Sequence, residues 1–507
     1  MFRSSGVLAH LTSLAGPFGV GDLGPSARRF AVMLSDLGQT WWQMLPVGPV
    51  GHGNSPYSSP SAFAGETLLI SPEDLAAEGL VRSQDPPRFP ATRVDYDRVR
   101  RWKRSVLAEA VEAVATSEAL DRFREENRDW LPDFALYTAL KDAHGGRPWW
   151  DWDRDLVRRR RSALASARRR LAESIIPIES AQFLFDLQFR RLREFCTRLG
   201  VRLIGDLPLY VALDSADTWT HPHLFDLDRD LRPRHVAGVP PDYFSRSGQL
   251  WGNPTYRWDR HLEEGFLWWR RRVGRLAGYF DLLRIDHFRG LVAFWAVPAG
   301  HSTAEEGRWV PGPGEAFFDA IRRDLGRLPF LAEDLGEITG DVVELRRRLG
   351  IPGMRVLQFG IDPNSEHHPA NHPPDVFSYT GTHDNDTLIG WWTSLTDRER
   401  RLAERSLGLG GGDVRWELIR VSMESKGITS ILPLQDLVGA GSEARMNTPG
   451  TVGGNWTWRV RSRSPAARER RRLLRLTELT GRIPPGFTNE RSFAKLRWRR
   501  AERWESE

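Results

Sequence analysis

Four apolar, strand-length stretches of this 507-residue chain each lead into an acidic residue. Residues 201–205 end in Asp206, and the other three stretches lead to Asp286, Glu333 and Asp384. Uninterrupted apolar runs of this length are typical of strands buried on both faces of a parallel sheet. The C-terminal ends of parallel barrel strands share one face, so we expect these four carboxylates to meet there.

Clustered, buried carboxylates repel one another, so a set of four indicates a function rather than support of the fold. One such function is metal binding through oxygen ligands, with His287, His383 or the histidines at 367–372 as further ligands. The other is cleavage of a glycosidic bond by two carboxyl groups around an oxocarbenium-like transition state. The 21 Trp residues favour a sugar ligand, because their flat rings suit stacking. Arg284 beside Asp286 could keep a nucleophilic carboxylate ionised.

The composition limits the classes of protein to consider. A formal net charge of +6 permits nucleic-acid binding, but the Arg runs lie in helical patterns with acids nearby, which favours solvated faces and no nucleic-acid partner. The single cysteine excludes an internal disulfide framework. No apolar stretch reaches the ~18 residues of a membrane span, and no signal peptide is evident, so we expect a cytoplasmic protein with no membrane partner. No Gly-rich phosphate loop supports a nucleotide fold.

The elements that must position the acids follow from periodicity and turn signals. Residues 1–24 are rich in turn formers, so the first barrel strand is predicted only at 40–46. A long loop with Tyr57 as its large polar-tipped side chain follows. Residues 71–178 are predicted to form an inserted, mainly helical subdomain, and 213–258 an ordered lid or loop region. The remaining chain alternates helix and strand, which predicts βα units and a parallel sheet.

The order of short motifs resembles the 4-alpha-glucanotransferases, or amylomaltases, of glycoside hydrolase family 77 in the α-amylase clan. The motifs that carry this resemblance lie at residues 5–8, 19–24, 54–57, 205–217, 240–254, 445–450 and 454–459, together with the stretches around the three later acids. The resemblance implies an α/β fold, a (β/α)8 TIM barrel with inserted helical and loop subdomains and no separate C-terminal β domain. The whole chain, 1–507, would form this single catalytic barrel, with 483–507 as a C-terminal extension of unassigned role.

The same resemblance implies roles for individual residues. Asp286 would be the nucleophile, Glu333 the general acid/base and Asp384 the transition-state stabiliser. The substrate-binding residues would be Tyr57, Asp206, Asp242, Trp251, Arg284, His383 and Asn455. Tyr57 would stack beneath the sugar at the cleavage point, and the 242–251 segment would form a lid over the acceptor side. Arg246 in that lid departs from the family pattern and could alter acceptor binding.

The implied activity is transfer of an α-1,4-glucan segment to the 4-hydroxyl of an acceptor through a covalent glucosyl-aspartate. Donors would be α-1,4-glucans and maltooligosaccharides, and acceptors glucose or maltooligosaccharides. Two alternatives stay open at this point: an α-amylase-like hydrolase, and a catalytically dead glucan-binding protein. No cofactor is implied, Ca²⁺ is not expected, and the sequence leaves the oligomeric state open.

Overall fold

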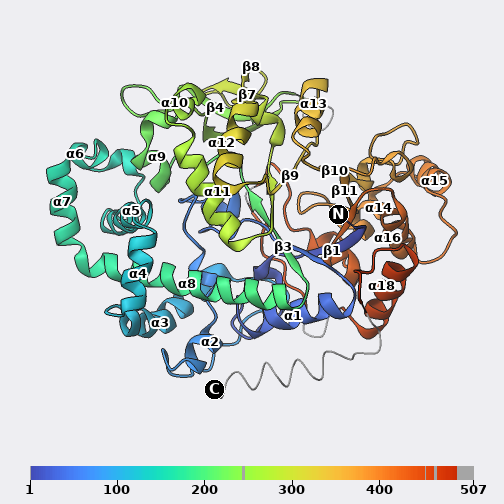
Figure 1. Ribbon diagram of the computed structural model, residues 1–507, viewed down its shortest axis with the longest axis horizontal. Helices are drawn as coiled ribbons and strands as arrows, with labels where there is room; N and C mark the ends of the chain where they lie inside the picture. Colours follow the sequence, from blue (N-terminus) through green and yellow to red (C-terminus); the bar gives the residue numbers. More distant parts are fainter. Residues whose placement is uncertain (1, 242–245, 452, 462–464, 488–507) are drawn as a thin grey trace.

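The computed structural model describes residues 2–241, 246–451, 453–461 and 465–487. Eight parallel strands form its central sheet, in the order β10-β11-β12-β1-β2-β3-β6-β9 (Figure 1). Their bounds are β1 (Ser4–Leu8), β2 (Trp41–Gln43), β3 (Arg202–Leu207), β6 (Leu282–Ile285), β9 (Phe330–Ala332), β10 (Gly353–Val356), β11 (Val376–Tyr379) and β12 (Thr429–Pro433). A backbone hydrogen bond from Ala332 N to Pro352 O, 2.9 Å long, joins the two ends of this sheet. The predicted (β/α)8 barrel is therefore confirmed.

One detail of the barrel prediction was wrong. The first strand is β1, which pairs with β2 on one side and β12 on the other, whereas the sequence predicted only turns there. The strand is easily missed because it is Ser-Ser-Gly-Val-Leu, with few large apolar residues. Small residues are required at this position: a Cβ on Gly6 would lie 2.4 Å from the Trp41 carbonyl oxygen. The tight packing between β1 and β2, rather than local propensity, selects the sequence.

Helices surround the barrel and extend it to one side. In the first half of the chain they are α1 (Pro25–Asp36), α2 (Pro72–Ala77), α3 (Tyr96–Val114), α4 (Glu118–Glu126), α5 (Leu131–Ala143), α6 (Arg154–Val157), α7 (Arg161–Arg170), α8 (Ala172–Arg198) and α9 (Ala216–Thr220). In the second half they are α10 (Trp258–Glu263), α11 (Leu267–Tyr279), α12 (Glu315–Leu325), α13 (Gly340–Arg348), α14 (Leu388–Ser394), α15 (Asp397–Ser406), α16 (Val414–Glu424), α17 (Leu434–Val438) and α18 (Ala467–Leu479). Figure 1 shows α2 to α7 at one side of the molecule, with the long helix α8 leading back to the barrel.

A second sheet lies between β3 and β9 in the chain. It is antiparallel, with the order β5-β4-β7-β8, and comprises β4 (His235–Val239), β5 (Gln249–Pro254), β7 (Ala293–Pro298) and β8 (Arg308–Pro311). Sequence reasoning expected a loop over 213–258, and the structure instead places two of these strands there. The central strand β4 pairs with β7, which begins more than fifty residues later in the chain. Such distant pairing leaves no local pattern, so it could not be predicted from periodicity.

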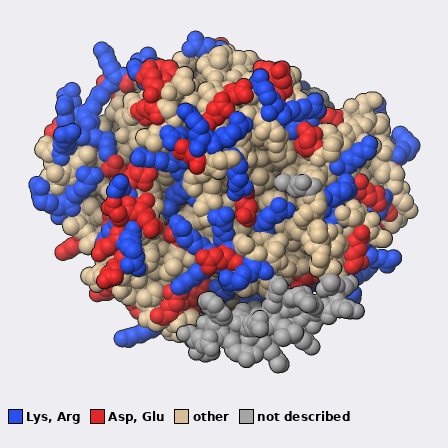
Figure 2. All heavy atoms as spheres, viewed as in Figure 1, with Lys and Arg blue, Asp and Glu red and all other residues tan. Residues whose placement is uncertain are grey.

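The barrel interior is filled by side chains from all eight strands. This cluster includes Leu8, Trp41, Ile204, Leu282, Leu331, Met354, Phe377, Tyr379 and Ile431. The outer surface mixes acidic and basic side chains over the face shown in Figure 2, which agrees with the interpretation of the Arg runs as solvated faces. Within the residues that the structure describes, none of the helices combines the length and apolarity needed to cross a membrane.

Candidate active site

Three of the predicted site residues form one buried charge chain at the C-terminal ends of β3 and β6. The Arg284 guanidinium donates to both oxygens of Asp206, at 2.9 and 2.8 Å, and lies 3.1 Å from Asp286. The Tyr57 hydroxyl donates to Asp206 Oδ2 at 2.8 Å, so this oxygen accepts from both Arg284 and Tyr57. Arg284 and Asp206 are buried, whereas the Asp286 side chain is 31% exposed. Arg284 therefore holds the charge of Asp286 at a point that a ligand can reach.

Glu333 follows β9 directly and lies against the chain that carries Asp286. Its carboxylate accepts a hydrogen bond from the backbone N–H of His287 at 2.7 Å. His287 has a left-handed backbone, with φ of 55°, which is costly for a residue with a Cβ. This turn directs the His287 amide at Glu333, so the local strain fixes the position of the carboxyl group.

The two carboxyl groups have raised pKa values and are coupled. The pKa of Glu333 is raised to about 8: burial is the main cause, Arg284 opposes it, and the Asp286 charge adds to it. Burial likewise raises the pKa of Asp286 to about 7, against the lowering effect of Arg284. Because the two groups interact, their two apparent pKa values belong to the pair rather than to either residue alone. The Arg284 contact favours Asp286 as the ionised member and Glu333 as the protonated one.

Asp384 lies in the segment after β11, where the sequence predicted it. One oxygen accepts from the Asn447 side-chain amide at 2.6 Å, and the other lies 3.3 Å from His383 Nε2. Arg445 donates to the Asp384 backbone carbonyl. Asn447 and Arg445 were quoted as part of the family motif but were not predicted as site residues. Their place in the 445–450 motif was the one sign in the sequence that these two residues could belong to the site.

The Tyr57 ring is stacked on His383, with centroids 5.2 Å apart and planes 10° apart. Trp456 contacts both rings, at 5.7 and 5.9 Å. Burial lowers the pKa of His383, although Asp384 opposes this shift, so the imidazole is neutral at pH 7. His383 can therefore offer a hydrogen bond to a sugar hydroxyl without placing a second cation beside Arg284.

The loop that carries Tyr57 is held by side chains of helix α8. Gln182 and Gln188 each bond both backbone groups of one loop residue, Gly65 and Ser71 respectively, at 2.7 to 3.2 Å. These four bonds satisfy buried backbone groups that a loop would otherwise leave unpaired. They anchor the end of the long segment between β2 and α2, in which Tyr57 lies on a short 3-10 helix, Pro56–Ser58.

The predicted lid is described only in part. Asp242 lies outside the described residues. Trp251 lies on β5, 38% exposed, with its ring edge-on to His287 at a centroid distance of 4.9 Å and 6.0 Å from Tyr210. The structure therefore brings Trp251 beside the segment that carries Asp286 and presents an exposed indole there.

Asn455 is the predicted site residue that the structure places in a supporting position. Its side-chain oxygen accepts from Thr448 N at 3.0 Å, and its amide donates to the Thr451 carbonyl and hydroxyl. Asn455 thereby braces the turn that follows Asn447. Its predicted role in substrate binding remains a prediction.

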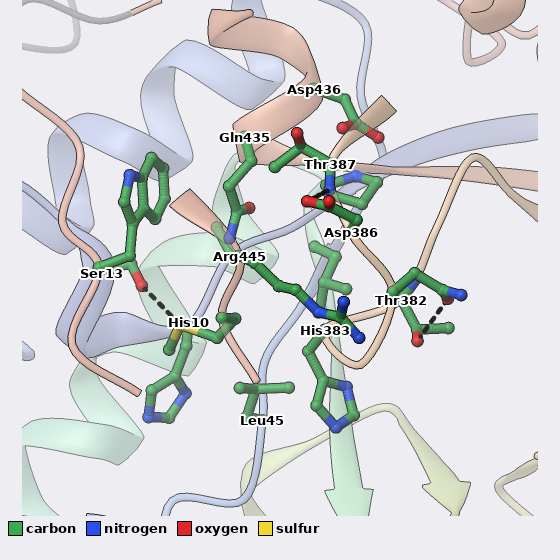
Figure 3. A pocket seen from close by; sticks show the side chains of 16 residues that line it. His10, Ser13, Leu45, Thr382, His383, Asp386, Thr387, Gln435, Asp436 and Arg445 are labelled. Carbon is green, nitrogen blue, oxygen red and sulfur yellow. Dashed lines mark hydrogen bonds between the residues drawn. The ribbon is translucent and has the colours of Figure 1, made fainter. Parts of the chain in front are cut away.

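A small cavity borders the site beside His383. It is lined by residues that follow β1, β11 and β12, including His10, Thr387, Gln435 and Arg445 (Figure 3). Burial lowers the pKa of His10 to about 3, so this imidazole is neutral as well. Among the described residues, no group of three or more His, Cys, Asp or Glu side chains is arranged to hold a metal ion.

The fold and the site together define a class of enzymes, those that act on glycosidic bonds. Three acids lie at the C-terminal face of a closed (β/α)8 barrel, and Arg284 holds one carboxylate beside a protonated carboxyl group. Comparison with known proteins identifies the family within that class. The sequence model of the 4-alpha-glucanotransferases, glycoside hydrolase family 77, matches residues 9–464. The chain belongs to this family, and the protein is a 4-alpha-glucanotransferase.

Relatives and solved structures agree with this assignment. A 4-alpha-glucanotransferase of Thermus thermophilus is 46% identical over 95% of this chain and 99% of its own length. One from Aquifex aeolicus is 44% identical over 90% of this chain and 96% of its own length. The amylomaltase of Streptococcus agalactiae, solved in complex with acarbose, superposes with a TM-score of 0.91 at 38% identity, covering 95% of this chain and all of that one.

Proposed function

We propose that the enzyme transfers α-1,4-glucan segments by a retaining double displacement. Asp286 attacks the anomeric carbon and forms an ester bond to it. The electron pair of the broken bond stays on the leaving sugar oxygen, which takes the proton of Glu333. The observation that carries this proposal is the coupled pair itself: Arg284 stabilises the anionic form of Asp286 while the pKa of Glu333 is raised to about 8.

In the second half of the reaction, Glu333 is a base. It takes the proton from the 4-hydroxyl of an acceptor, which we propose to be glucose or a maltooligosaccharide, as that oxygen displaces Asp286 from the anomeric carbon. Asp384 and the neutral His383 would bind hydroxyls of the sugar at the cleavage point, while the buried Asp206 would hold Arg284 and Tyr57 in place. Trp251 would provide an apolar surface for the acceptor and help to exclude water, which favours transfer over hydrolysis.

The expected distance between the Asp286 and Glu333 carboxyl groups is roughly 5 to 5.5 Å, the spacing of retaining enzymes. Glu333→Gln supplied with maltotriosyl fluoride should accumulate the intermediate, because fluoride leaves without a proton and the base for the second step is missing. Mass spectrometry of digested protein should then find a maltotriosyl group on the peptide that contains Asp286. A label on another residue, or none, would refute the assigned nucleophile.

Transfer and hydrolysis are separated by the product balance with maltotriose. Transfer gives glucose and longer maltodextrins at a constant number of reducing ends. A number that rises with time would identify water as the main acceptor, as in the hydrolase alternative. The domain limits, the role of Arg246 in the lid and the cytoplasmic location stay predictions.

A further inference from the structure

Glu333 leaves its strand at the weakest point of the barrel. One backbone hydrogen bond, from Ala332 N to Pro352 O, is formed between the described residues of β9 and those leading into β10, whereas the other neighbouring barrel strands pair over at least three residues. The backbone of Glu333 bonds toward β6, through Ile285 O at 3.1 Å and Phe288 N at 3.2 Å. The side facing β10 needs another means of fixation.

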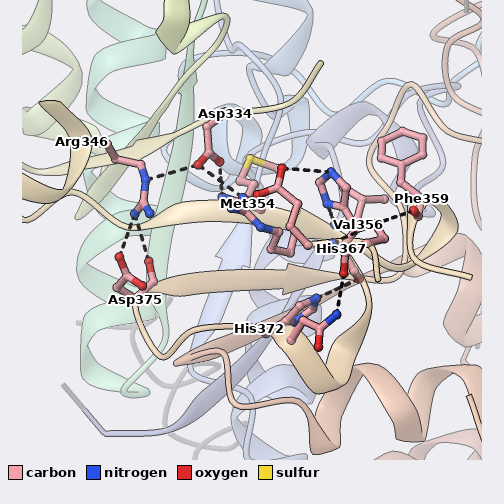
Figure 4. Close-up of polar contacts among 12 residues, drawn as sticks. Asp334, Arg346, Met354, Val356, Phe359, His367, His372 and Asp375 are labelled. Carbon is pink, nitrogen blue, oxygen red and sulfur yellow. Dashed lines mark hydrogen bonds and ion pairs between the residues drawn. The ribbon is translucent and has the colours of Figure 1, made fainter. Parts of the chain in front are cut away.

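The carboxylate of Asp334 takes the place of backbone pairing on that side. It accepts from the backbone N–H of Met354 at 2.6 Å and lies 3.3 Å from Arg355 and 3.2 Å from Arg346 (Figure 4). Asp334 is 1% exposed, and both guanidinium groups are buried with it. A carboxylate that bridges two buried cations and a strand amide is held far more firmly than a surface ion pair.

Gly353 makes the room that this carboxylate occupies. A Cβ at position 353 would lie 2.4 Å from Asp334 Oδ2 and 2.8 Å from Oδ1. The backbone of Gly353 needs no special conformation that would otherwise explain a glycine, since its φ is not positive. The missing side chain of Gly353 therefore leaves the space, here called the seat, that the Asp334 carboxylate fills.

The contacts continue outward from both guanidinium groups. Arg355 donates to Glu366 at 2.6 Å, in the loop that follows β10, and Arg346 lies 3.2 Å from Asp375 at the start of β11. Figure 4 shows Asp334 and Arg346 on one side of these strands and the 367–372 loop beyond them. The acid next to Glu333 is thus tied to two neighbouring strands and to that loop.

We propose that Asp334 is a positioning residue for the proton-transfer steps of Glu333: bound by Met354, Arg346 and Arg355 in the seat left by Gly353, it fixes the direction in which Glu333 leaves β9. The inference rests on the proposed acid/base role of Glu333 and adds the support that this role requires. A displacement of about 1 Å at a reacting group costs on the order of 10²-fold in rate, so loss of the seat should slow proton transfer selectively.

The test compares two donors in the first turnover. Asp334→Asn keeps one oxygen for the Met354 amide and loses the charge that binds the two arginines. Cleavage of maltotriose, whose leaving oxygen needs a proton, should fall about 10- to 100-fold. Release of fluoride from maltotriosyl fluoride, which needs no proton, should fall less than about threefold. The Km for maltotriose should change little, because Asp334 does not face the cleft.

Asp436→Asn is the matched control. Asp436 is also buried, on α17 directly after β12, where it accepts from the Thr380 hydroxyl and Leu388 N at 2.7 and 2.8 Å and supports the segment of Asp384. Asp436→Asn should lower the first-turnover rate with both donors by the same factor, because Asp384 acts with either leaving group. If Asp334→Asn is poorly folded, Gly353→Ala provides a second variant, since it displaces the Asp334 carboxylate while leaving its charge.

Glu333→Ala separates the two proposals. It should discriminate between the donors more strongly than Asp334→Asn does; if it slows both equally, the acid/base role of Glu333 itself fails. If Glu333→Ala discriminates but Asp334→Asn and Gly353→Ala slow both donors equally, or neither, the positioning role of Asp334 is overturned. Selective loss with maltotriose in either variant supports it.

The pH profile gives a second readout. The charged groups that face Glu333 are Arg284 and Asp286 from the end of β6 and Asp334 beside it, together with the His287 backbone N–H. The negative charge of Asp334 raises the pKa of Glu333, so Asp334→Asn should shift the alkaline limb for maltotriose to lower pH. An unchanged limb would show that the Asp334 charge does not act on Glu333 and would count against the proposal.

Discussion

Replacement of Arg284 tests how the site keeps its nucleophile ionised. Arg284→Met removes the one cation that lies within 3.1 Å of Asp286 among the described residues and leaves the buried Asp206 without its cationic partner. A nearby opposite charge lowers a carboxyl pKa by about 1 to 3 units. The Asp286 side chain is 31% exposed, so solvent screening places the effect in the lower half of that range, about 1 to 2 units.

The acidic limb of kcat/Km should therefore move upward by about 1 to 2 pH units. Below that limb, the rate should fall about 10- to 100-fold, since each unit corresponds to a factor of ten in the ionised fraction. Stability should fall as well, by about 3 to 5 kcal/mol, because Asp206 is left as an uncompensated buried charge. The assay is a pH series of maltotriose disproportionation, with urea unfolding of the same samples.

The acidic limb of Arg284→Lys should lie between those of the wild type and Arg284→Met, because lysine keeps the positive charge but not the rigid, planar guanidinium. Arg270→Met is the control, since Arg270 forms its ion pair with Asp324 at the surface. An acidic limb that stays within about 0.3 units in Arg284→Met would refute the reasoning that this cation sets the ionisation of Asp286.

Two further predictions concern stability. Buried Arg482 donates to five backbone carbonyls, those of Ser4, Met423, Ser425, Gly427 and Ile428, at 2.7 to 3.3 Å. Arg482→Met should lower the free energy of unfolding by at least about 3 kcal/mol, measured in urea, whereas exposed Arg475→Met should not; equal values would show that these bonds contribute nothing. Glu333→Gln should be inactive on maltotriose but more stable by roughly 1 to 2 kcal/mol at pH 8.5. The pKa of Glu333 is about 8 in the folded protein against 4.5 when unfolded. The contribution of Glu333 to wild-type stability is therefore fully present below pH 4.5 and is lost as pH rises through 8, so the stability difference between wild type and Glu333→Gln should vanish at pH 4.5. Melting curves at both pH values check this, and a Glu333→Gln protein that is less stable at pH 8.5 would contradict the sign.

The interpretation of the barrel strands succeeded where the strand was apolar along its whole length. The runs that lead to Asp206, Asp286, Glu333 and Asp384 all became barrel strands, and their acids lie at or just beyond the C-terminal ends. It failed at β1, whose small residues are selected by contact with Trp41, and at the antiparallel sheet, whose two local strand pairs are joined by the distant pairing of β4 with β7. Local patterns record burial but not the identity of the partner strand.

Several contacts of the site could not be read from single residues. Asn447 bonds Asp384 from more than sixty residues away, and Arg346 and Arg355 hold Asp334 from the next helix and strand. In the sequence these are ordinary polar residues in an Arg-rich chain. Their roles arise from burial, which turns a weak charge pair into a firm constraint.

The amino-acid sequence by itself placed four acids at the ends of apolar runs, which left metal binding or cleavage of a glycosidic bond as the chemistry, and its ordered motifs indicated the family. The tertiary structure alone shows what surrounds each acid. Arg284 lies between Asp206 and Asp286, while the strained turn at His287 directs an amide at Glu333. Ionisation depends on distance and burial, and these quantities exist only once the chain has closed into the barrel.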